Sequence, residues 1–272
     1  MNCKTEAIVL HSIKYGDSRL IVDMFTREHG RLSFGTNIPK SGHAKIKKQY
    51  FQPLTLLYIE ADVRQQQQVH KLKDVSMLCP IASLLTDPSK LAIALFIAEF
   101  LYHAMKDEQT NTPLFDYIRS SIEWLDNRQD HYANFHLVFL IHLSRFLGFF
   151  PNLSKEERSK EGRSMEGWSK EGRSMERRSM EGSNEIRGEG VYFDLRAATF
   201  CTTPPPHHDY LMPEEAGHIA LIMRMDYATM HLFRLSRAER NRILEIVEHY
   251  YRLHLPAFPE LRSLPVLREL FD

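Results

Sequence analysis

Cysteine is scarce in this chain, which has 272 residues and three cysteines, Cys3, Cys79 and Cys201. An odd number of cysteines without paired spacing excludes a disulfide framework and a cysteine-rich zinc module. The chain also lacks any run of the roughly 18 to 20 apolar residues that a transmembrane helix needs, and its first residues lack the pattern of a secretory signal peptide. We therefore expect a cytoplasmic protein with reduced thiols and no membrane contact.

Motifs of catalysis are missing as well. The chain contains no GxxxxGK[ST] phosphate loop, no GxGxxG after a strand, no GxSxG turn and no HExxH pair, which argues against nucleotide-dependent and zincin-type enzymes. The cluster His207-His208-Asp209 follows three prolines, so we interpret it as a surface turn in preference to a metal site. We expect no enzymatic activity, no catalytic residue, no cofactor and no metal. A hydrolase is the weakest alternative, because no nucleophile, base and orienting group can be named together.

The distribution of charge is more informative than its total, because 35 Lys and Arg balance 35 Asp and Glu. The first 75 residues carry twelve basic and seven acidic side chains, and Glu28 is the one acidic residue in the basic segment 27–48. This segment either attracts a polyanion through its positive potential or is a solvated lysine loop. The candidate DNA-binding residues are Arg27, Arg31, Lys40, Lys45, Lys47 and Lys48.

The first 75 residues have the two-residue period of β-strands. Leu20, Val22 and Met24 alternate with the residues between them, and four further short segments have a similar pattern. Five short strands fit a small closed barrel, which leaves no unpaired sheet edge. We predict an OB-type barrel over residues 1–78, with an SH3-like barrel as the second choice.

From residue 80 onward the apolar period is that of α-helices. The segment 88–105 is apolar on nearly all sides, which is typical of a central helix. Ser236 and Glu239 have the spacing of a capping box before a long amphipathic helix. We predict an all-helical domain over residues 79–272, so the whole chain is expected to be an α+β protein.

A low-complexity tract interrupts the helical part. Residues 154–190 repeat every five residues, as in SKEGR and SMEGW, and contain almost no aliphatic side chain. Five residues advance a helix by about 500°, so the sparse methionines cannot form a continuous apolar stripe. We predict a flexible, disordered insertion in the helical domain.

Several short motifs occur in an informative order. They are Ala7-Ile8-Val9-Leu10, Tyr15-Gly16-Asp17-Ser18, Phe25-Thr26 with Gly30-Arg31, the basic loop through Lys40-Ser41 and Lys45 to Lys48, Gln52-Pro53-Leu54, Phe146-Leu147-Gly148-Phe149-Phe150-Pro151 and Leu261-Arg262-Ser263-Leu264. Their order across a barrel followed by helices resembles the RecO family of recombination mediators. The resemblance covers nearly the whole chain apart from the pentapeptide tract.

The resemblance implies a DNA repair protein that is not an enzyme. Members of this family bind single- and double-stranded DNA, anneal complementary strands and, with RecR, help RecA to replace the single-stranded-DNA-binding protein SSB, whose acidic C-terminal tail they contact. The expected partners are therefore DNA, RecR and SSB directly and RecA indirectly, at the bacterial nucleoid. The alternative is a protein-only adaptor that binds RecR-like or SSB-like partners without annealing activity.

One departure from the family concerns zinc. Many members carry a four-cysteine zinc module after the Gly-Phe-Pro region, whereas this chain has only Cys201 there. We predict that no zinc binds and that the strand-like segment 191–195 takes the place of the module.

Two further assignments stay open at this point. Phe34, Tyr50 and Phe51 lie near the basic segment and are either stacking platforms for bases or part of the barrel core, and we favour the core. For an acidic SSB tail, a helical groove near Arg128 and Arg145 is the candidate, because such a peptide needs a cation beside an apolar slot.

Overall fold

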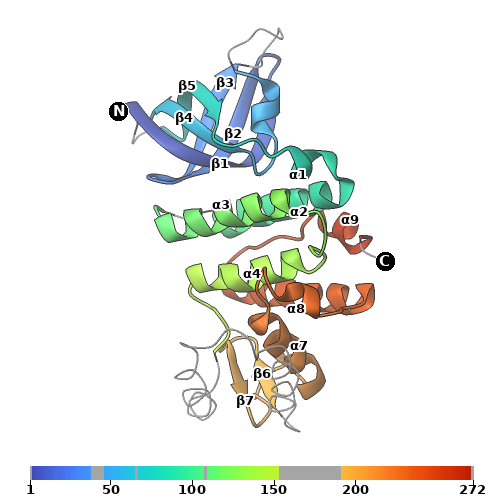
Figure 1. Cartoon of the computed structure of the whole chain (residues 1–272). Helices are drawn as coiled ribbons and strands as arrows, with labels where there is room; N and C mark the ends of the chain where they lie inside the picture. The colour runs from blue at the N-terminus through green and yellow to red at the C-terminus, as the bar shows by residue number, and fades with distance from the viewer. Residues whose placement is uncertain (1, 38–45, 65–66, 107–108, 153–190, 271–272) are drawn as a thin grey trace, which may run out of the picture. The chain divides into compact units, whose positions relative to one another are not determined.

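The computed structural model describes residues 2–37, 46–64, 67–106, 109–152 and 191–270 (Figure 1). The chain forms two compact units, the first made of Met1–His136 with Ala257–Asp272 and the second of Leu137–Pro256. The prediction for the tract 154–190 concerns residues outside the described part of the chain.

A closed barrel of five strands opens the first unit. Its strands are β1 (Asn2–Tyr15), β2 (Arg19–Thr26), β3 (Gly30–Asn37), β4 (Leu56–Asp62) and β5 (Val69–Met77). The order around the barrel is β1-β2-β3-β5-β4, and all neighbours are antiparallel except β3 and β5, which run parallel. The OB-type barrel predicted from the sequence is thus confirmed, and with it the α+β class.

The barrel core follows from the alternation in the sequence. Leu20 and Met24 of β2 point into the core and are at most 8% exposed, so the residues that alternate with them face outward. Phe34 and Phe51 are buried in the same core, and Tyr50 packs against it partly buried. The two phenylalanines are therefore core residues and are not available to stack on bases.

The helices of the first unit include two long ones with well-defined starts. Its helices are η1 (Lys48–Phe51), α1 (Ala82–Thr86), α2 (Pro88–Ala104), α3 (Thr112–Asn127) and α9 (Leu264–Arg268). The Asp87 side chain accepts hydrogen bonds from the first amides of α2, and Asn111 caps α3 in the same way. Each cap precedes a proline in the first turn of its helix. Proline lacks an amide hydrogen, and the amides of the first turn have no hydrogen-bond partner within the helix, so no helical hydrogen bond is lost.

A buried lysine joins the ends of these helices. Lys90 of α2 is 1% exposed, and its ammonium group donates to the Ser83 hydroxyl and to the backbone carbonyls of Asp126 and Arg128. These carbonyls lie at the C-terminal end of α3, where the helix dipole favours a positive charge. The positive charge of Lys90 therefore serves to join these helix ends within the fold.

The C-terminal segment of the chain returns to α2. The Glu99 carboxylate accepts hydrogen bonds from the backbone amides of Arg262 and Ser263 at 2.9 and 2.8 Å. The Phe258 ring lies 5.0 Å from the ring of Phe100, centre to centre. These contacts explain why residues far apart in the sequence belong to one unit.

The second unit combines helices with short strands. It contains most of α4 (Phe135–Phe146), and α7 (Pro213–Arg224), η3 (Met230–Leu232) and α8 (Arg237–His254). The capping box predicted at Ser236 and Glu239 is present at the start of α8. Tyr250 and Tyr251 of α8 donate hydrogen bonds to backbone carbonyls, and burial raises the pKa of both phenols, so they stay neutral donors.

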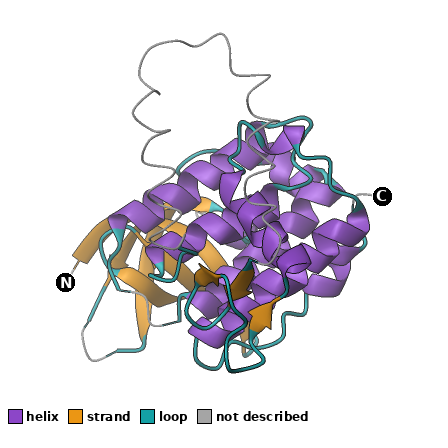
Figure 2. Ribbon diagram, turned by 90° about the horizontal axis from the view of Figure 1, so that it is seen from below, coloured by secondary structure: helices purple, strands orange, loops and turns teal. Residues whose placement is uncertain are grey.

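The strands of the second unit form a sheet in the order β7-β6-β8 (orange in Figure 2). They are β6 (Tyr192–Asp194), β7 (Thr199–Cys201) and β8 (Tyr210–Leu211). The sequence indicated β6 alone, so the part of the chain after the barrel is not helical throughout. The Asp209 carboxylate lies 2.6 Å from the Arg196 guanidinium group and 3.3 Å from the His249 ring, which ties the sheet region to α8.

The His207-His208-Asp209 segment lies at this sheet. The His207 ring is 3.4 Å from the Asp194 carboxylate. Within the described ranges, no three His, Cys, Asp or Glu side chains are placed to hold a metal ion together. Among the helices that the structure describes, none has the length and apolar character needed to cross a membrane.

Candidate nucleic-acid interface

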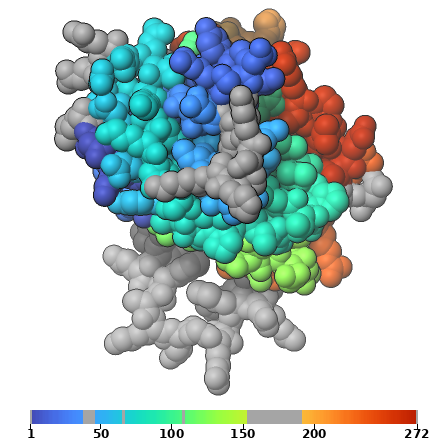
Figure 3. Space-filling view, turned by 90° about the horizontal axis from the view of Figure 1, so that it is seen from above, coloured from blue at the N-terminus to red at the C-terminus, as the bar shows by residue number. Residues whose placement is uncertain are grey.

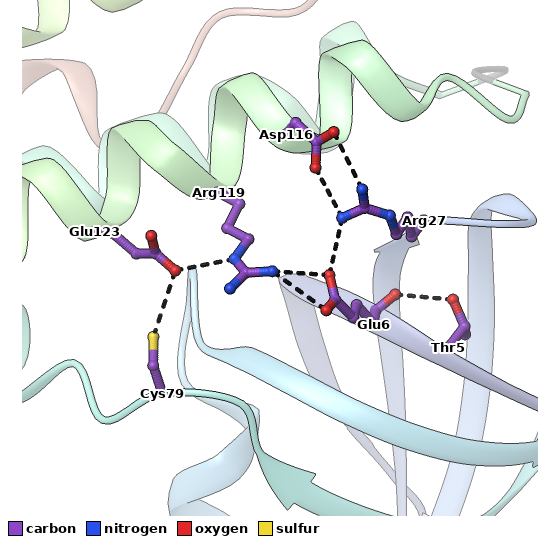
Figure 4. Close-up of polar contacts among 7 residues, drawn as sticks. All are labelled: Thr5, Glu6, Arg27, Cys79, Asp116, Arg119 and Glu123. Carbon is purple, nitrogen blue, oxygen red and sulfur yellow. Dashed lines mark hydrogen bonds and ion pairs between the residues drawn. The ribbon is translucent and has the colours of Figure 1, made fainter.

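Two of the six predicted residues lie where the β2–β3 hairpin turns. Arg27 follows β2, and its guanidinium group is 3.1 Å from the Glu6 carboxylate and 2.7 Å from that of Asp116 in α3 (Figure 4). The same group lies over the Phe115 ring, 5.6 Å from its centre. Arg27 is therefore engaged in contacts within the protein.

Arg31 of β3 contacts α2 in a comparable way. Its guanidinium group donates a hydrogen bond of 2.8 Å to the Tyr102 carbonyl and lies 4.4 Å from the centre of the Tyr102 ring. A cation over an aromatic face is attracted by the ring quadrupole. The structure thus gives Arg27 and Arg31 a role in holding the barrel to α3 and α2.

The contacts of Arg27 belong to a larger set, here called the helix-facing network, which consists of Glu6, Arg27, Asp116, Arg119 and Glu123 (Figure 4). Arg119 joins Glu123 at 2.9 Å and Glu6 at 3.0 Å. The hydrogen bond to Glu123, followed by the field of Glu6, raises the pKa of the Arg119 guanidinium group. Three carboxylates surround two guanidinium groups, so the network has no excess positive charge to offer a polyanion.

The remaining candidates are lysines. Lys47 precedes η1 and Lys48 begins it, both side chains are exposed, and neither forms an ion pair with any residue that the structure describes. Lys40 and Lys45 lie outside the described residues. The structure therefore separates the candidates, with Arg27 and Arg31 against the helices and the two described lysines in solvent.

A groove opens at the other end of the β2–β3 hairpin and is here called the barrel groove. It is lined by parts of β2, β3 and β5 and by Ile46, and Arg19, Asn37 and Lys71 are among its lining residues. It lies beside the place where β3 and β5 pair over only three residues. OB folds bind oligonucleotides on strands 2 and 3 and on the loops between strands 1 and 2 and between strands 4 and 5. The lining residues of the barrel groove come from this part of the barrel. The residues of the barrel are blue to cyan in Figure 3.

Arg19 and Lys71 add two cations that the sequence analysis did not select. Both side chains are exposed, and neither has an ion-pair partner among the described residues. Arg19 and Lys71 line the groove, and the exposed Lys47 and Lys48 follow its lining residue Ile46 in the chain. We call these four residues the groove cations. None of the four has a carboxylate partner within the described ranges, so each contributes an uncancelled positive field to the barrel surface.

A histidine forms part of the groove wall. His70 is 4% exposed, and burial lowers the pKa of its ring. Its Nδ1 atom accepts a hydrogen bond of 3.3 Å from the backbone amide of Arg64, which requires an unprotonated nitrogen. His70 is therefore neutral and positions the β4–β5 connection without adding charge to the groove.

Comparison with known proteins agrees with this fold. The family model for the N-terminal part of recombination protein O matches residues 1–80, and the model for its C-terminal part matches residues 85–265. The chain belongs to the RecO family of DNA repair proteins. It is 44% identical over 269 residues to DNA repair protein RecO of Phocaeicola vulgatus and 45% identical over 270 residues to that of Bacteroides fragilis, with 99% of each chain covered. RecO of Flavobacterium psychrophilum is 30% identical over 275 residues, with 100% of both chains covered.

For this RecO-family chain, one of the two missed cations had a signal in the sequence. Arg19 directly follows the Gly16-Asp17-Ser18 turn, which is the connection between the first two strands of the barrel and part of the usual OB ligand surface. Lys71 had no such signal, because its nearness to Arg19 depends on the parallel pairing of β3 with β5. Neither Arg19 nor Lys71 lies in the dense basic segment 27–48.

The two arginines considered for an SSB tail each lie over an aromatic ring. The Arg128 guanidinium group is 5.0 Å from the centre of the Trp124 ring, and that of Arg145 is 4.1 Å from the centre of the Phe150 ring. Arg128 belongs to the first unit and Arg145 to the second. The RecO-type groove for an acidic tail near these residues stays a prediction.

Proposed function

We propose that this protein is a RecO-type recombination mediator that binds single- and double-stranded DNA at the barrel groove and anneals complementary strands. With RecR, it promotes loading of RecA on single strands coated by SSB, and it contacts the acidic tail of SSB. It acts by binding and catalyses no covalent step. Membership of the RecO family supports this proposal, because the matching relatives carry the name DNA repair protein RecO.

The observation that carries the proposal is the set of groove cations. Lys and Arg side chains that neutralise phosphates release condensed counterions, which gives affinity without regard to sequence. Annealing needs two polyanions on one surface, so cations not already paired with carboxylates are required to screen their repulsion. Arg19 and Lys71 meet this requirement on the face of the barrel that binds oligonucleotides in other OB folds.

Annealing of two complementary oligonucleotides tests the proposal. The double substitution Arg19→Ala and Lys71→Ala should slow annealing and reduce the log-log salt slope of single-strand binding by about 1.4, at about 0.7 per lost phosphate contact. A matched control replaces Lys4 and Lys73 by Ala, because both are barrel lysines that contact Glu60 and Asn2, respectively. An equal loss of annealing in the control would contradict the assignment of the groove.

The same assay separates the mediator from a protein-only adaptor. A mediator anneals bare oligonucleotides in the absence of RecR and SSB. An adaptor binds an acidic peptide that ends in phenylalanine but leaves the annealing rate at its spontaneous value. This second result would contradict the proposed function while leaving family membership intact.

A further inference from the structure

The β1–β2 hairpin carries an exposed apolar surface next to the barrel groove. Tyr15 at the end of β1 is 61% exposed, and Ile13 on the same strand is 44% exposed. No described residue hydrogen-bonds to the Tyr15 hydroxyl or packs a ring against it. An aromatic side chain this exposed, on a surface that already carries cations, has no function in the barrel core.

The strand register places Tyr15 beside a groove cation. Tyr15 pairs with Arg19 across the hairpin, and Ile13 pairs with Ile21. Directly opposite residues of an antiparallel pair project from the same face of the sheet. Because Leu20 points into the barrel core, Arg19 and Ile21 point outward, and Tyr15 and Ile13 do the same.

Strand β3 continues this face of the barrel. Arg19 pairs with Asn37 of β3, and Ile21 pairs with Gly35. Gly35 has no side chain of its own, but the position that its Cβ would take lies 3.3 Å from Cγ1 of Val69, so the Val69 side chain packs over it. A ring lying against Tyr15 therefore meets Ile13, with the Arg19 guanidinium group at its edge.

We propose that Tyr15 stacks with an unpaired base while Arg19 holds a phosphate of the same strand, so that this subsite selects single-stranded over double-stranded DNA. The inference rests on the proposed function of the barrel groove. Every base has a π-face, so the subsite accepts any sequence. In a duplex the bases are already stacked on each other, and a base reaches Tyr15 only after it is unpaired.

The chemistry of the surface favours nucleic acid over a protein partner. Arg19 lies directly opposite Tyr15, and Lys71 pairs with Gly35 at the far side of the same face. An aromatic ring among cations matches a chain that alternates bases with phosphates. An apolar protein surface would leave these charges without partners.

Fluorescence anisotropy with a single-stranded oligonucleotide and with its blunt duplex, at one salt concentration, tests the subsite. Tyr15→Ala should weaken single-strand binding by about 5- to 150-fold, the range expected for one lost stacking contact. Binding of the duplex should stay near the wild-type value. Tyr15→Phe keeps the ring and should restore single-strand binding, which shows that the hydroxyl is not needed.

A matched control and a second readout keep the test specific. Tyr58 on β4 is 43% exposed, and it pairs with Glu6 and Ser76 instead of groove residues. Tyr58→Ala should bind both DNA forms like the wild type. The fluorescence of 2-aminopurine in the single strand should be quenched by the wild type and by Tyr15→Phe but not by Tyr15→Ala, because quenching reports stacking.

The outcomes separate this inference from the proposed function. Wild-type single-strand affinity of Tyr15→Ala, or an equal loss for both DNA forms, would overturn the subsite. If the Arg19 and Lys71 double variant still loses affinity in that case, the barrel groove remains the DNA site. If that double variant also binds like the wild type, the proposed function fails as well.

Discussion

The two ends of the β2–β3 hairpin differ in how their cations are used. At the turn, Arg27 pairs with carboxylates of β1 and α3, and Arg31 lies on the Tyr102 ring of α2. At the open end, Arg19 is exposed beside the barrel groove and has no ion-pair partner among the described residues. The same residue type therefore joins the barrel to helices at one end and is available to a polyanion at the other.

This contrast shows that pairing matters more than the local count of basic residues. A guanidinium group held between two carboxylates has little net field, and a phosphate would have to displace those partners before binding. An exposed cation loses only water and counterions when a phosphate arrives, and the released counterions contribute favourable entropy. Affinity for DNA should therefore follow the groove cations, and stability should follow the helix-facing network.

The largest expected effect comes from removing all four groove cations. The combined substitution of Arg19, Lys47, Lys48 and Lys71 by Ala should weaken single-strand binding by about 100-fold at moderate salt and lower the log-log salt slope by about 3. The thermal unfolding midpoint should change little, because these side chains are exposed and have no ion-pair partners in the described structure. A titration of affinity against salt concentration measures the slope. An unchanged slope would remove the barrel groove from the DNA site.

Much of the fold was predictable because it depends on local periodicity. The inward positions of β2, such as Leu20 and Met24, repeat every second residue, and this period holds whatever the partner strand is. The capping box at Ser236 and Glu239 spans three residues and could be recognised without any tertiary information. The strands β7 and β8 were missed because three- and two-residue segments are too short to display a period.

The candidate site was only partly predictable, because pairing between distant residues decides it. Asp116, which holds Arg27, is 89 positions away in the sequence, and no local pattern connects the two. Lys71 reaches the same groove as Arg19 only through the parallel pairing that closes the barrel. Lys47 and Lys48 could be named as candidates because a dense basic segment is visible in the sequence itself.

The helix-facing network should respond in stability and not in DNA affinity. Glu6→Ala removes the carboxylate shared by Arg27 and Arg119 and should lower the free energy of unfolding by about 1 to 2 kcal/mol, since both guanidinium groups are partly buried. Chemical denaturation measures this change. Glu60→Ala is the matched control, because this half-buried carboxylate of the same barrel contacts only Lys4 and Asn2, outside the network, among the described residues. Its free energy of unfolding should change less than that of Glu6→Ala. If Glu6→Ala kept the stability of the wild type but bound DNA more weakly, the helix-facing network would belong to the DNA site, against this prediction.

Single substitutions at Arg31 and Arg19 give a smaller but sharper contrast. Arg31→Ala should lower the free energy of unfolding by about 1 kcal/mol, because it removes a hydrogen bond and a cation–π contact to Tyr102. Its DNA affinity should stay close to that of the wild type. Arg19→Ala should do the opposite, with weaker DNA binding and unchanged unfolding. If Arg31→Ala instead lost DNA affinity without losing stability, the arginine at the turn would belong to the DNA site.

Acidification should lower the free energy of unfolding through His103 of α2. Burial lowers the pKa of His103, and the charge of Arg31 lowers it further against the opposing effect of Glu99. The unfolded chain, with a histidine pKa of about 6.5, therefore takes up a proton before the folded protein does, so stability declines as the pH falls below that value. The decline should be well under about 1.4 kcal/mol per pH unit, because His103 is only partly buried. The free energy of unfolding, measured by chemical denaturation, should differ less between pH values of about 7 and 5.5 in His103→Gln than in the wild type. An unchanged difference would mean that His103 takes up its proton equally in the folded and unfolded states.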